Sequence, residues 1–252
     1  EPKYKTGFDR NLWIWEEYTA GLTYMISADV ARGDGQDYST FHVFKLETAE
    51  IVAEYKGKPT PDIFADILFQ AGKEFGDCML VVENNSVGWG VLSKLEEKAY
   101  PNLYYSRKTT HEHVETYQAE ATGVIPGFTT SSKTRPLVIS KLEELIRNKL
   151  INIKSRRLFN EMKTFVWENG KPQAMKKHND DLIIACAIGC WVKETAFTVN
   201  QRAVEYKKAF LTSMTSTSTE LNTSIPGMLA YKQKEKNKNK QNYKDFVWLI
   251  KG

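Results

Sequence analysis

The chain contains 252 residues, of which 41% are hydrophobic and 26% charged, the usual composition of a folded globular protein. Its formal net charge is only +4, from 35 basic and 31 acidic residues, so overall charge does not by itself indicate a nucleic-acid partner. Three cysteines are too few for a disulfide framework, and no run is apolar enough for a signal peptide or a bilayer span, so we expect a reducing compartment and no membrane partner.

The first part of the chain predicts mainly strands. Residues 1–21 form an aromatic lead-in segment without clear periodicity. An apolar strand follows over 23–29 and ends at a carboxylate. After a turn at 32–37 that is rich in glycine and aspartate, we expect strands over 39–46 and 51–55 to form a hairpin.

The middle of the chain alternates helices and strands. A proline in the first turn and an apolar stripe predict a helix over 61–75, and the short continuous apolar run at 79–82 predicts a buried central strand. A helix over 90–99 and a strand over 103–105 follow. Residues 106–133 lack periodicity and predict a long loop, a kind of segment that often carries function.

The last ordered elements are predicted between residues 135 and 196. The apolar pattern indicates a helix over 135–148 and a short strand over 150–153. An Asn-Gly pair, typical of a type I′ turn, predicts a strand–turn–strand hairpin over 159–175. The strongest helical pattern of the chain covers 181–196.

This order of elements predicts an α/β fold, in which helices flank a mixed sheet and a β-hairpin is added. We predict one domain over residues 1–210. From 211 to 252 the sequence is rich first in Ser and Thr and then in Lys, Asn and Gln. Such a composition buries little apolar surface, so we expect a weakly ordered C-terminal tail.

Carboxylates stand at the ends of three apolar segments. Asp29 ends the first strand, Glu83 directly follows the central strand, and Asp180 and Asp181 precede the last helix. Strand ends and a helix start can converge at one edge of a sheet. A carboxylate that follows a buried strand is costly unless it is paired or bound to a metal, and hard oxygen ligands favour Mg²⁺ or Mn²⁺.

Each acid also has a structural explanation. An aspartate in a turn can cap backbone amides, and one of Asp180 and Asp181 is expected to be a helix N-cap, although a cap needs only one acid. Asp34 and Asp37 are candidate accessory carboxylates or solvated turn residues, and His178 is a candidate ligand, proton shuttle or exposed residue. Together the acids predict a metal-dependent nuclease, in which two cations about 3.5–4 Å apart cleave a phosphodiester.

The order and context of these segments resemble the RNase H/RuvC-like nuclease superfamily. More narrowly, the chain resembles the C-terminal nuclease domain of the large terminase subunit of tailed bacteriophages, over about residues 20–200. The motifs that carry the resemblance are SADVARGDGQDYS at 27–39, VENN at 82–85, GWG at 88–90, GFTT at 127–130 with Arg135, and NDDL at 179–182.

The resemblance implies an RNase H-like fold and a metal-dependent endonuclease that cuts concatemeric double-stranded DNA during viral genome packaging, in the cytoplasm of the host cell. It assigns catalytic and metal-binding roles to Asp29, Glu83 and one of Asp180 and Asp181, and it implies two Mg²⁺ or Mn²⁺ ions. Relatives differ in which acid of the pair contacts the metal directly; we expect Asp181, with Asp180 as an outer or second-metal ligand. It also implies the portal and the small terminase subunit as partners. Full-length members carry an ATPase motor domain, but the sequence contains no Gly-x-x-x-x-Gly-Lys-Ser/Thr motif, so we expect the nuclease part of a longer protein.

A nuclease that cuts duplex DNA grips the backbone mainly with Lys and Arg, although a basic cluster can also be a solvated face. Lys176 and Lys177 directly precede the acidic pair, so we expect them nearest the cleaved phosphate. No helix-turn-helix or zinc finger is evident, which predicts little sequence preference. The candidate DNA contacts are Arg32, Lys108, Lys133, Arg135, Lys176 and Lys177.

Other functions fit the same residues. A Holliday-junction resolvase or an RNase H would keep the fold and change the substrate, and a non-catalytic DNA-binding or assembly module would make the acids structural. A dinucleotide-binding interpretation is weaker, because Gly33 and Gly35 lack the third glycine of that motif and a strand, not a helix, follows. A zinc site on Cys186 and Cys190 would need ligands that the sequence does not supply.

Overall fold

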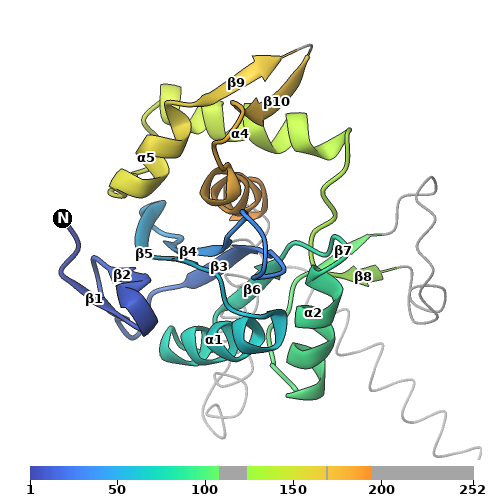
Figure 1. Cartoon of the computed structure of the whole chain (residues 1–252). Coiled ribbons are helices and arrows are strands. Elements are labelled where there is room, and N and C mark those ends of the chain that lie inside the picture. Colours follow the sequence, from blue (N-terminus) through green and yellow to red (C-terminus); the bar gives the residue numbers. More distant parts are fainter. Residues whose placement is uncertain (108–123, 169, 194–252) are drawn as a thin grey trace, which may run out of the picture. The chain divides into compact units, whose positions relative to one another are not determined.

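The computed structural model of the chain describes residues 1–107, 124–168 and 170–193 (Figure 1). The predicted tail at 211–252 and the candidate DNA contact Lys108 lie outside these residues. The described part is a mixed α/β arrangement around a six-stranded sheet with strand order β1-β2-β5-β4-β3-β6, as the sequence predicts. Among the described helices, none combines the length and the apolar character that crossing a bilayer requires.

The sheet contains β1 (Tyr4–Thr6), β2 (Leu12–Ile14), β3 (Tyr24–Asp29), β4 (Ser39–Lys45), β5 (Glu50–Gly57) and β6 (Met79–Val82). Two short antiparallel pairs join β7 (Tyr105–Arg107) to β8 (Val124–Pro126), and β9 (Phe165–Glu168) to β10 (Lys171–Ala174). The helices are the short 3-10 turn η1 (Phe8–Arg10), α1 (Pro61–Glu74), α2 (Gly88–Glu97), α4 (Thr134–Arg147), α5 (Arg156–Met162) and a helix over 181–193.

Helices cover both faces of the sheet, so the core has two layers. On one face α1 and α2 pack around apolar side chains such as Phe41, Phe64 and Leu80. On the other face α4, α5 and the helix over 181–193 enclose a second cluster that includes Phe44 and Ile184 (Figure 1). Because strands β3 and β6 are buried from both sides, they are nearly continuous apolar runs in the sequence.

The position of the candidate site follows from the strand directions. Strand β3 is antiparallel to β4 but parallel to β6, with Ala28 opposite Val82. Parallel neighbours end at the same edge of a sheet, so the residues that follow this pair, Asp29 and Glu83, lie side by side at that edge. Close backbone packing supports the edge: a Cβ on Gly127, which has a φ of +80°, would lie 2.5 Å from the Val82 oxygen.

The sheet margin differs from the sequence prediction in two places. The lead-in segment at 1–21 contains two strands that the sequence did not predict, because β1 and β2 extend the sheet, and β2 pairs with β5 through the register Leu12 to Tyr55. The predicted strand at 150–153 is reduced to one bridge between Glu50 and Asn152. In both places pairing with β5, a contact distant in sequence, decides the outcome.

The predicted strand over 159–167 is also wrong, because its first part is helical. Helix α5 begins after Ser155, whose hydroxyl accepts a hydrogen bond from the Leu158 N–H and caps the helix. Leu158 and Glu161 lie on the same buried side of this short helix, as the i, i+3 spacing permits. The hairpin of β9 and β10 then starts at Phe165, later than predicted.

Candidate functional site

Two of the predicted acids, Asp29 and Glu83, come from adjacent strands. The Glu83 N–H donates to the Ala28 oxygen at 2.9 Å, which continues the pairing of β3 and β6 by one residue. The Asn85 side-chain amide donates to Glu83 Oε1 at 2.9 Å and orients that carboxylate. Glu83 is buried, with 8% of its surface exposed, and Asp29 is partly buried.

The environment of Asp29 is unfavourable for a negative charge. Burial raises the pKa of the Asp29 carboxyl well above its usual range, and the charge of Glu83, which is in hydrogen-bonding contact with it, raises the pKa further. The charges of Asp181 and Asp180 act in the same direction. The structure therefore brings together all four acids that the sequence places at strand and helix ends.

Asp180 occupies the N-cap position of the helix over 181–193, since its carbonyl accepts the Ile184 N–H at 2.9 Å. Its carboxylate does not cap the helix. Oδ2 accepts a bond from the Arg135 guanidinium at 2.5 Å and from the Ala174 N–H at 3.2 Å. Arg135, predicted as a DNA contact, thus holds Asp180 in this structure, and Ala174 links the acid to strand β10.

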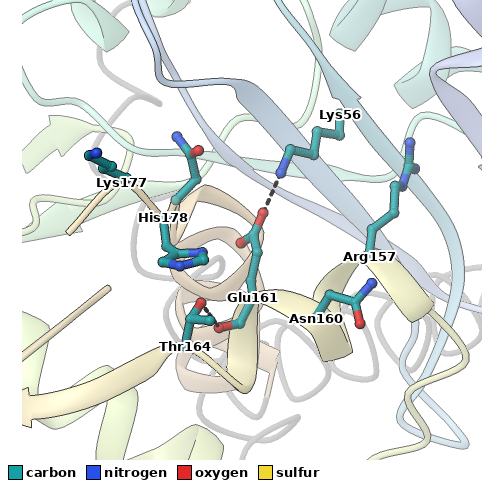
Figure 2. A pocket seen from close by; sticks show the side chains of 8 residues that line it. Lys56, Arg157, Asn160, Glu161, Thr164, Lys177 and His178 are labelled. Carbon is teal, nitrogen blue, oxygen red and sulfur yellow. Dashed lines mark hydrogen bonds and ion pairs between the residues drawn. The ribbon is translucent and has the colours of Figure 1, made fainter. Parts of the chain in front are cut away.

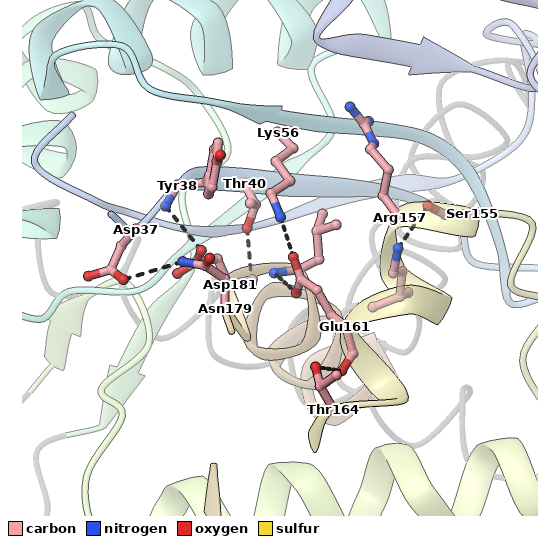
Figure 3. Close-up of polar contacts among 12 residues, drawn as sticks. Asp37, Tyr38, Thr40, Lys56, Ser155, Arg157, Glu161, Thr164, Asn179 and Asp181 are labelled. Atoms are coloured by element: carbon pink, nitrogen blue, oxygen red, sulfur yellow. Dashed lines mark hydrogen bonds and ion pairs between the residues drawn. The ribbon is translucent and has the colours of Figure 1, made fainter. Parts of the chain in front are cut away.

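Asp181 is the first residue of the same helix and is only 7% exposed. Its Oδ2 accepts a hydrogen bond from the Tyr38 N–H at 3.0 Å (Figure 3). Burial raises the pKa of Asp181 to about 6, the charges of Asp37 and Asp180 contribute in the same sense, and the Tyr38 N–H and Lys56 oppose the shift. Asp181 therefore titrates closer to neutral pH than an exposed aspartate.

The helix that carries Asp181 is fixed against the sheet by buried polar side chains. Their bonds to main-chain oxygens of the helix join Ser27 to Ala185 at 2.7 Å, Thr40 to Asp181 at 2.9 Å and His42 to Leu182 at 2.9 Å. The two layers approach so closely that a Cβ on Gly189 would lie 2.3 Å from the Phe44 ring. Small residues and sheet hydroxyls in these positions set the depth at which Asp181 enters the site.

Sequence reasoning missed Glu161, a fifth carboxylate close to the cluster. It is 7% exposed, pairs with Lys56 at 2.5 Å and accepts the Leu182 N–H at 2.9 Å (Figure 3). Burial raises its pKa to about 7 although Lys56 opposes the shift, and the charge of Asp181 adds to it. The available signal was the spacing of Leu158 and Glu161, which a helix places on one side.

The remaining predicted residues lie around this cluster. Asp37 is in reach of the Asn179 amide at 3.5 Å and acts electrostatically on Asp181, which places it beside the site. Asp34 and Arg32 are exposed in the turn after β3, and Lys133 is exposed at the N-cap of α4. The side chains of Lys176, Lys177 and His178 are exposed in the segment before the acidic pair.

Whether these residues suit a metal ion can be judged from their chemistry. Within the described ranges, no three or more His, Cys, Asp or Glu side chains are arranged as a ready-made ligand set. Asp180 is turned to Arg135 and Asp181 to the Tyr38 amide. The converging donors are all carboxylate oxygens, however, and the contact between Asp29 and Glu83 is one that a hard cation relieves, so the donor set fits Mg²⁺ or Mn²⁺.

No protein-family model matches the chain. Among solved structures, it is similar to the large terminase nuclease of the thermophilic phage G20c with bound magnesium, with a TM-score of 0.58 and 18% identity over 75% of this chain and 89% of that one. The cobalt-bound form of the same nuclease gives a TM-score of 0.57. The large terminase nuclease domain of Thermus phage P74-26 gives 0.51, with 20% identity over 74% of this chain and 86% of that one. At these identities the likeness establishes a shared fold, and it confirms the predicted RNase H-like mixed sheet flanked by helices.

Proposed function

We propose that this chain is a metal-dependent endonuclease that cuts double-stranded DNA, and that it serves as the nuclease of a phage DNA-packaging terminase. The observation that carries the proposal is the convergence of Asp29, Glu83, Asp180 and Asp181 from two strand ends and a helix start, in surroundings that raise the pKa of Asp29. The fold that the chain shares with terminase nucleases, some of them with bound magnesium or cobalt, supports both the activity and the metal.

In this proposal Asp29, Glu83 and Asp181 hold divalent cations, and Asp180 is an outer ligand. When bound, such cations supply an activated water and stabilise the leaving oxygen of the cleaved phosphodiester. The protein's own contribution is positional. Asn85 orients Glu83, Arg135 restrains Asp180, and the hydrogen bonds from the sheet hold the helix of Asp181 at fixed depth.

The raised pKa values give the cluster a defined dependence on pH. Because Asp29 and Asp181 must lose protons before they can bind a cation, cation binding releases protons and strengthens as pH rises toward neutrality. If the acids had only a structural role, a rise in pH would bring no such gain, because their deprotonation would only add repulsion between carboxylates and destabilise the fold.

The DNA backbone is expected to approach over the exposed cations that surround the acids. Arg32, Lys133, Lys176 and Lys177 remain candidates for these contacts, because their side chains are exposed next to the site-forming segments. Concatemer cutting during packaging would further require an ATPase motor in the full-length protein, with the portal and the small terminase subunit as partners, in the host cytoplasm.

Plasmid nicking tests the activity. The full chain should relax and linearise supercoiled DNA in Mn²⁺ or Mg²⁺ but not in EDTA, and an RNA–DNA hybrid assayed in parallel separates a DNA endonuclease from an RNase H. Asp29→Asn should remove cleavage while DNA binding survives. Asp77→Asn is a matched control, since Asp77 precedes β6 at the end of the strand opposite Glu83 and its φ of +55° suits asparagine.

A further inference from the structure

A polar cavity lies beside the acidic cluster, the name used here for Asp29, Glu83, Asp180 and Asp181. It has a volume of about 310 Å³, at the lower end of the range for ligand pockets, and its walls come from β5, α5 and the segment at 177–179 (Figure 2). Apart from Glu161, every side chain that lines it carries a hydrogen-bond donor: Lys56, Arg157, Asn160, Thr164, Lys177, His178 and Asn179.

The charge of this cavity is opposite to that of its neighbour. Three of the lining side chains are cations, but Lys56 is paired with Glu161 at 2.5 Å and Arg157 with Glu54 at 2.7 Å. Lys177 therefore supplies the surplus positive charge of the lining, which together with the many donors suits an anion with several acceptor oxygens. Its lining contains no broad aromatic face on which a base could stack.

The cavity and the acidic cluster share an edge. Asn179 lines the cavity, bonds Asp37 at 3.5 Å and lies two residues before Asp181. Lys56 bonds Glu161 and lies 4.4 Å from the centre of the Tyr38 ring, whose residue donates its N–H to Asp181 (Figure 3). A ligand that reached across this edge would meet the carboxylates on one side and the cationic cavity on the other.

The backbone at Lys177 is held in an unusual conformation. Its φ is +69°, and the His178 N–H bonds the Met175 oxygen at 3.0 Å, which makes Lys177 the third residue of a tight turn where Gly or Asn is preferred. A lysine at such a position is strained, as Lys149 is at the end of α4, so the strain describes the turn and the case for binding rests on where the Lys177 side chain lies. The side chain of Lys177 borders the cavity (Figure 2).

We propose that this cavity binds a backbone phosphate of the DNA strand, next to the phosphate that the acidic cluster cuts. Successive phosphates of one strand rise by about 3.4 Å along the helix axis, so a strand with one phosphate at the carboxylates presents its neighbour to the adjoining surface. Lys56, Lys177 and Asn160 are the contacts. The assignment rests on the proposed DNA-cutting function and extends it to residues outside the acids.

Asn160→Asp is the sharpest test, because it places a carboxylate in the cavity with almost no change in shape. Asn160 is exposed on α5, so the fold should survive. Asn148→Asp makes the same change at the exposed C-cap of α4 and is the matched control. Binding of the full chain to a labelled duplex in EDTA, followed by fluorescence anisotropy, should weaken about tenfold for Asn160→Asp and less than about twofold for Asn148→Asp.

The outcomes separate this assignment from the proposed function. Equal effects of the two substitutions would overturn the phosphate site even if the wild type cuts plasmid. A selective effect of Asn160→Asp would support it even if no cleavage is found. NMR distinguishes a DNA phosphate from a free anion. The NMR signal of the Asn160 side-chain amide should shift when the duplex is added and should not shift with inorganic phosphate at equal phosphate concentration. A shift with inorganic phosphate alone would overturn the assignment to DNA.

Discussion

The acidic cluster and the neighbouring cationic cavity are built in different ways. The cluster gathers carboxylates that repel one another, as the raised pKa of Asp29 shows, so it is poised for cations. In the cavity two of the three cations have carboxylate partners, with Lys56 bonded to Glu161 and Arg157 to Glu54 at 2.7 Å. In the cluster, a bound cation would relieve the repulsion between carboxylates. In the cavity, most of the charges are already paired within the protein.

This difference predicts opposite responses to mutation. Removing the charge of Asp29 from the cluster should harm activity and help stability, whereas removing a paired cation of the cavity, such as Lys56, should leave its buried carboxylate partner unpaired and harm stability. Effects of the same sign in both regions would mean that the two are one structural network.

The largest effect is expected at Asp29. In Mn²⁺, Asp29→Asn should lower the rate of plasmid cleavage by at least about 10³-fold, because a metal ligand is lost. In EDTA at pH 7 the same variant should unfold at a higher temperature than the wild type, since its neutral side chain no longer faces Glu83. Calorimetry and nicking assays measure the two effects, and a lower melting temperature in EDTA would favour a purely structural role for the acid.

The next effect concerns the pH dependence of the cavity wall. The pKa of Glu161 is raised from 4.5 to about 7, so its contribution to stability is fully present below pH 4.5 and is lost as pH rises through 7. Glu161→Gln does not titrate. The free energy of unfolding of Glu161→Gln, relative to wild type, should therefore increase by about 3 kcal/mol between pH 4.5 and 8 in EDTA.

Urea unfolding at several pH values measures this difference. Its slope with pH is the informative quantity, because Glu161→Gln also changes the hydrogen bonds that this side chain makes to Lys56 and to the Leu182 N–H. A flat difference would place Glu161 in an ordinary solvated environment. Glu143→Gln, at an exposed position on α4, supplies the control.

The two regions also differ in how much the sequence predicts. Each acid of the cluster directly follows or precedes its own apolar segment, so local patterns were sufficient for Asp29, Glu83 and Asp181. The strand pairing that joins them follows from the order of the elements. The proximity of Asp29 and Glu83 could be predicted because each is the residue directly after a pair of parallel partners, Ala28 and Val82, at the same edge of the sheet.

The cavity could not be predicted in the same way. It depends on α5, which the sequence suggested as a strand, and on contacts between segments far apart in the chain, such as Lys56 with Glu161. Arg135 shows the same limit: its basic character predicts a DNA contact, but the sequence did not reveal that its position on α4 pairs it with Asp180. Charge is visible in a sequence, but the partner of a charge is set by packing.

Arg135 provides a smaller test of the boundary between the regions. Arg135→Met keeps much of the aliphatic bulk and removes the bond to Asp180, so stability should fall by about 1–2 kcal/mol and cleavage should decrease. The salt dependence of DNA affinity should not change if Arg135 only positions the acid. A slope reduced by about 1 would return Arg135 to the DNA contacts.

The smallest effect is expected at Lys177, where strain and binding oppose each other. Lys177→Gly relieves the positive φ of the turn, so the free energy of unfolding should rise by up to about 1 kcal/mol. The same change removes a cation from the cavity, so DNA affinity should fall and its salt slope should decrease by about 1. Lys149→Gly, with a φ of +55° at the exposed end of α4, should gain the stability without losing affinity. Because the backbone strain is alike at the two lysines, a loss of affinity confined to Lys177 can come only from its side chain in the cavity.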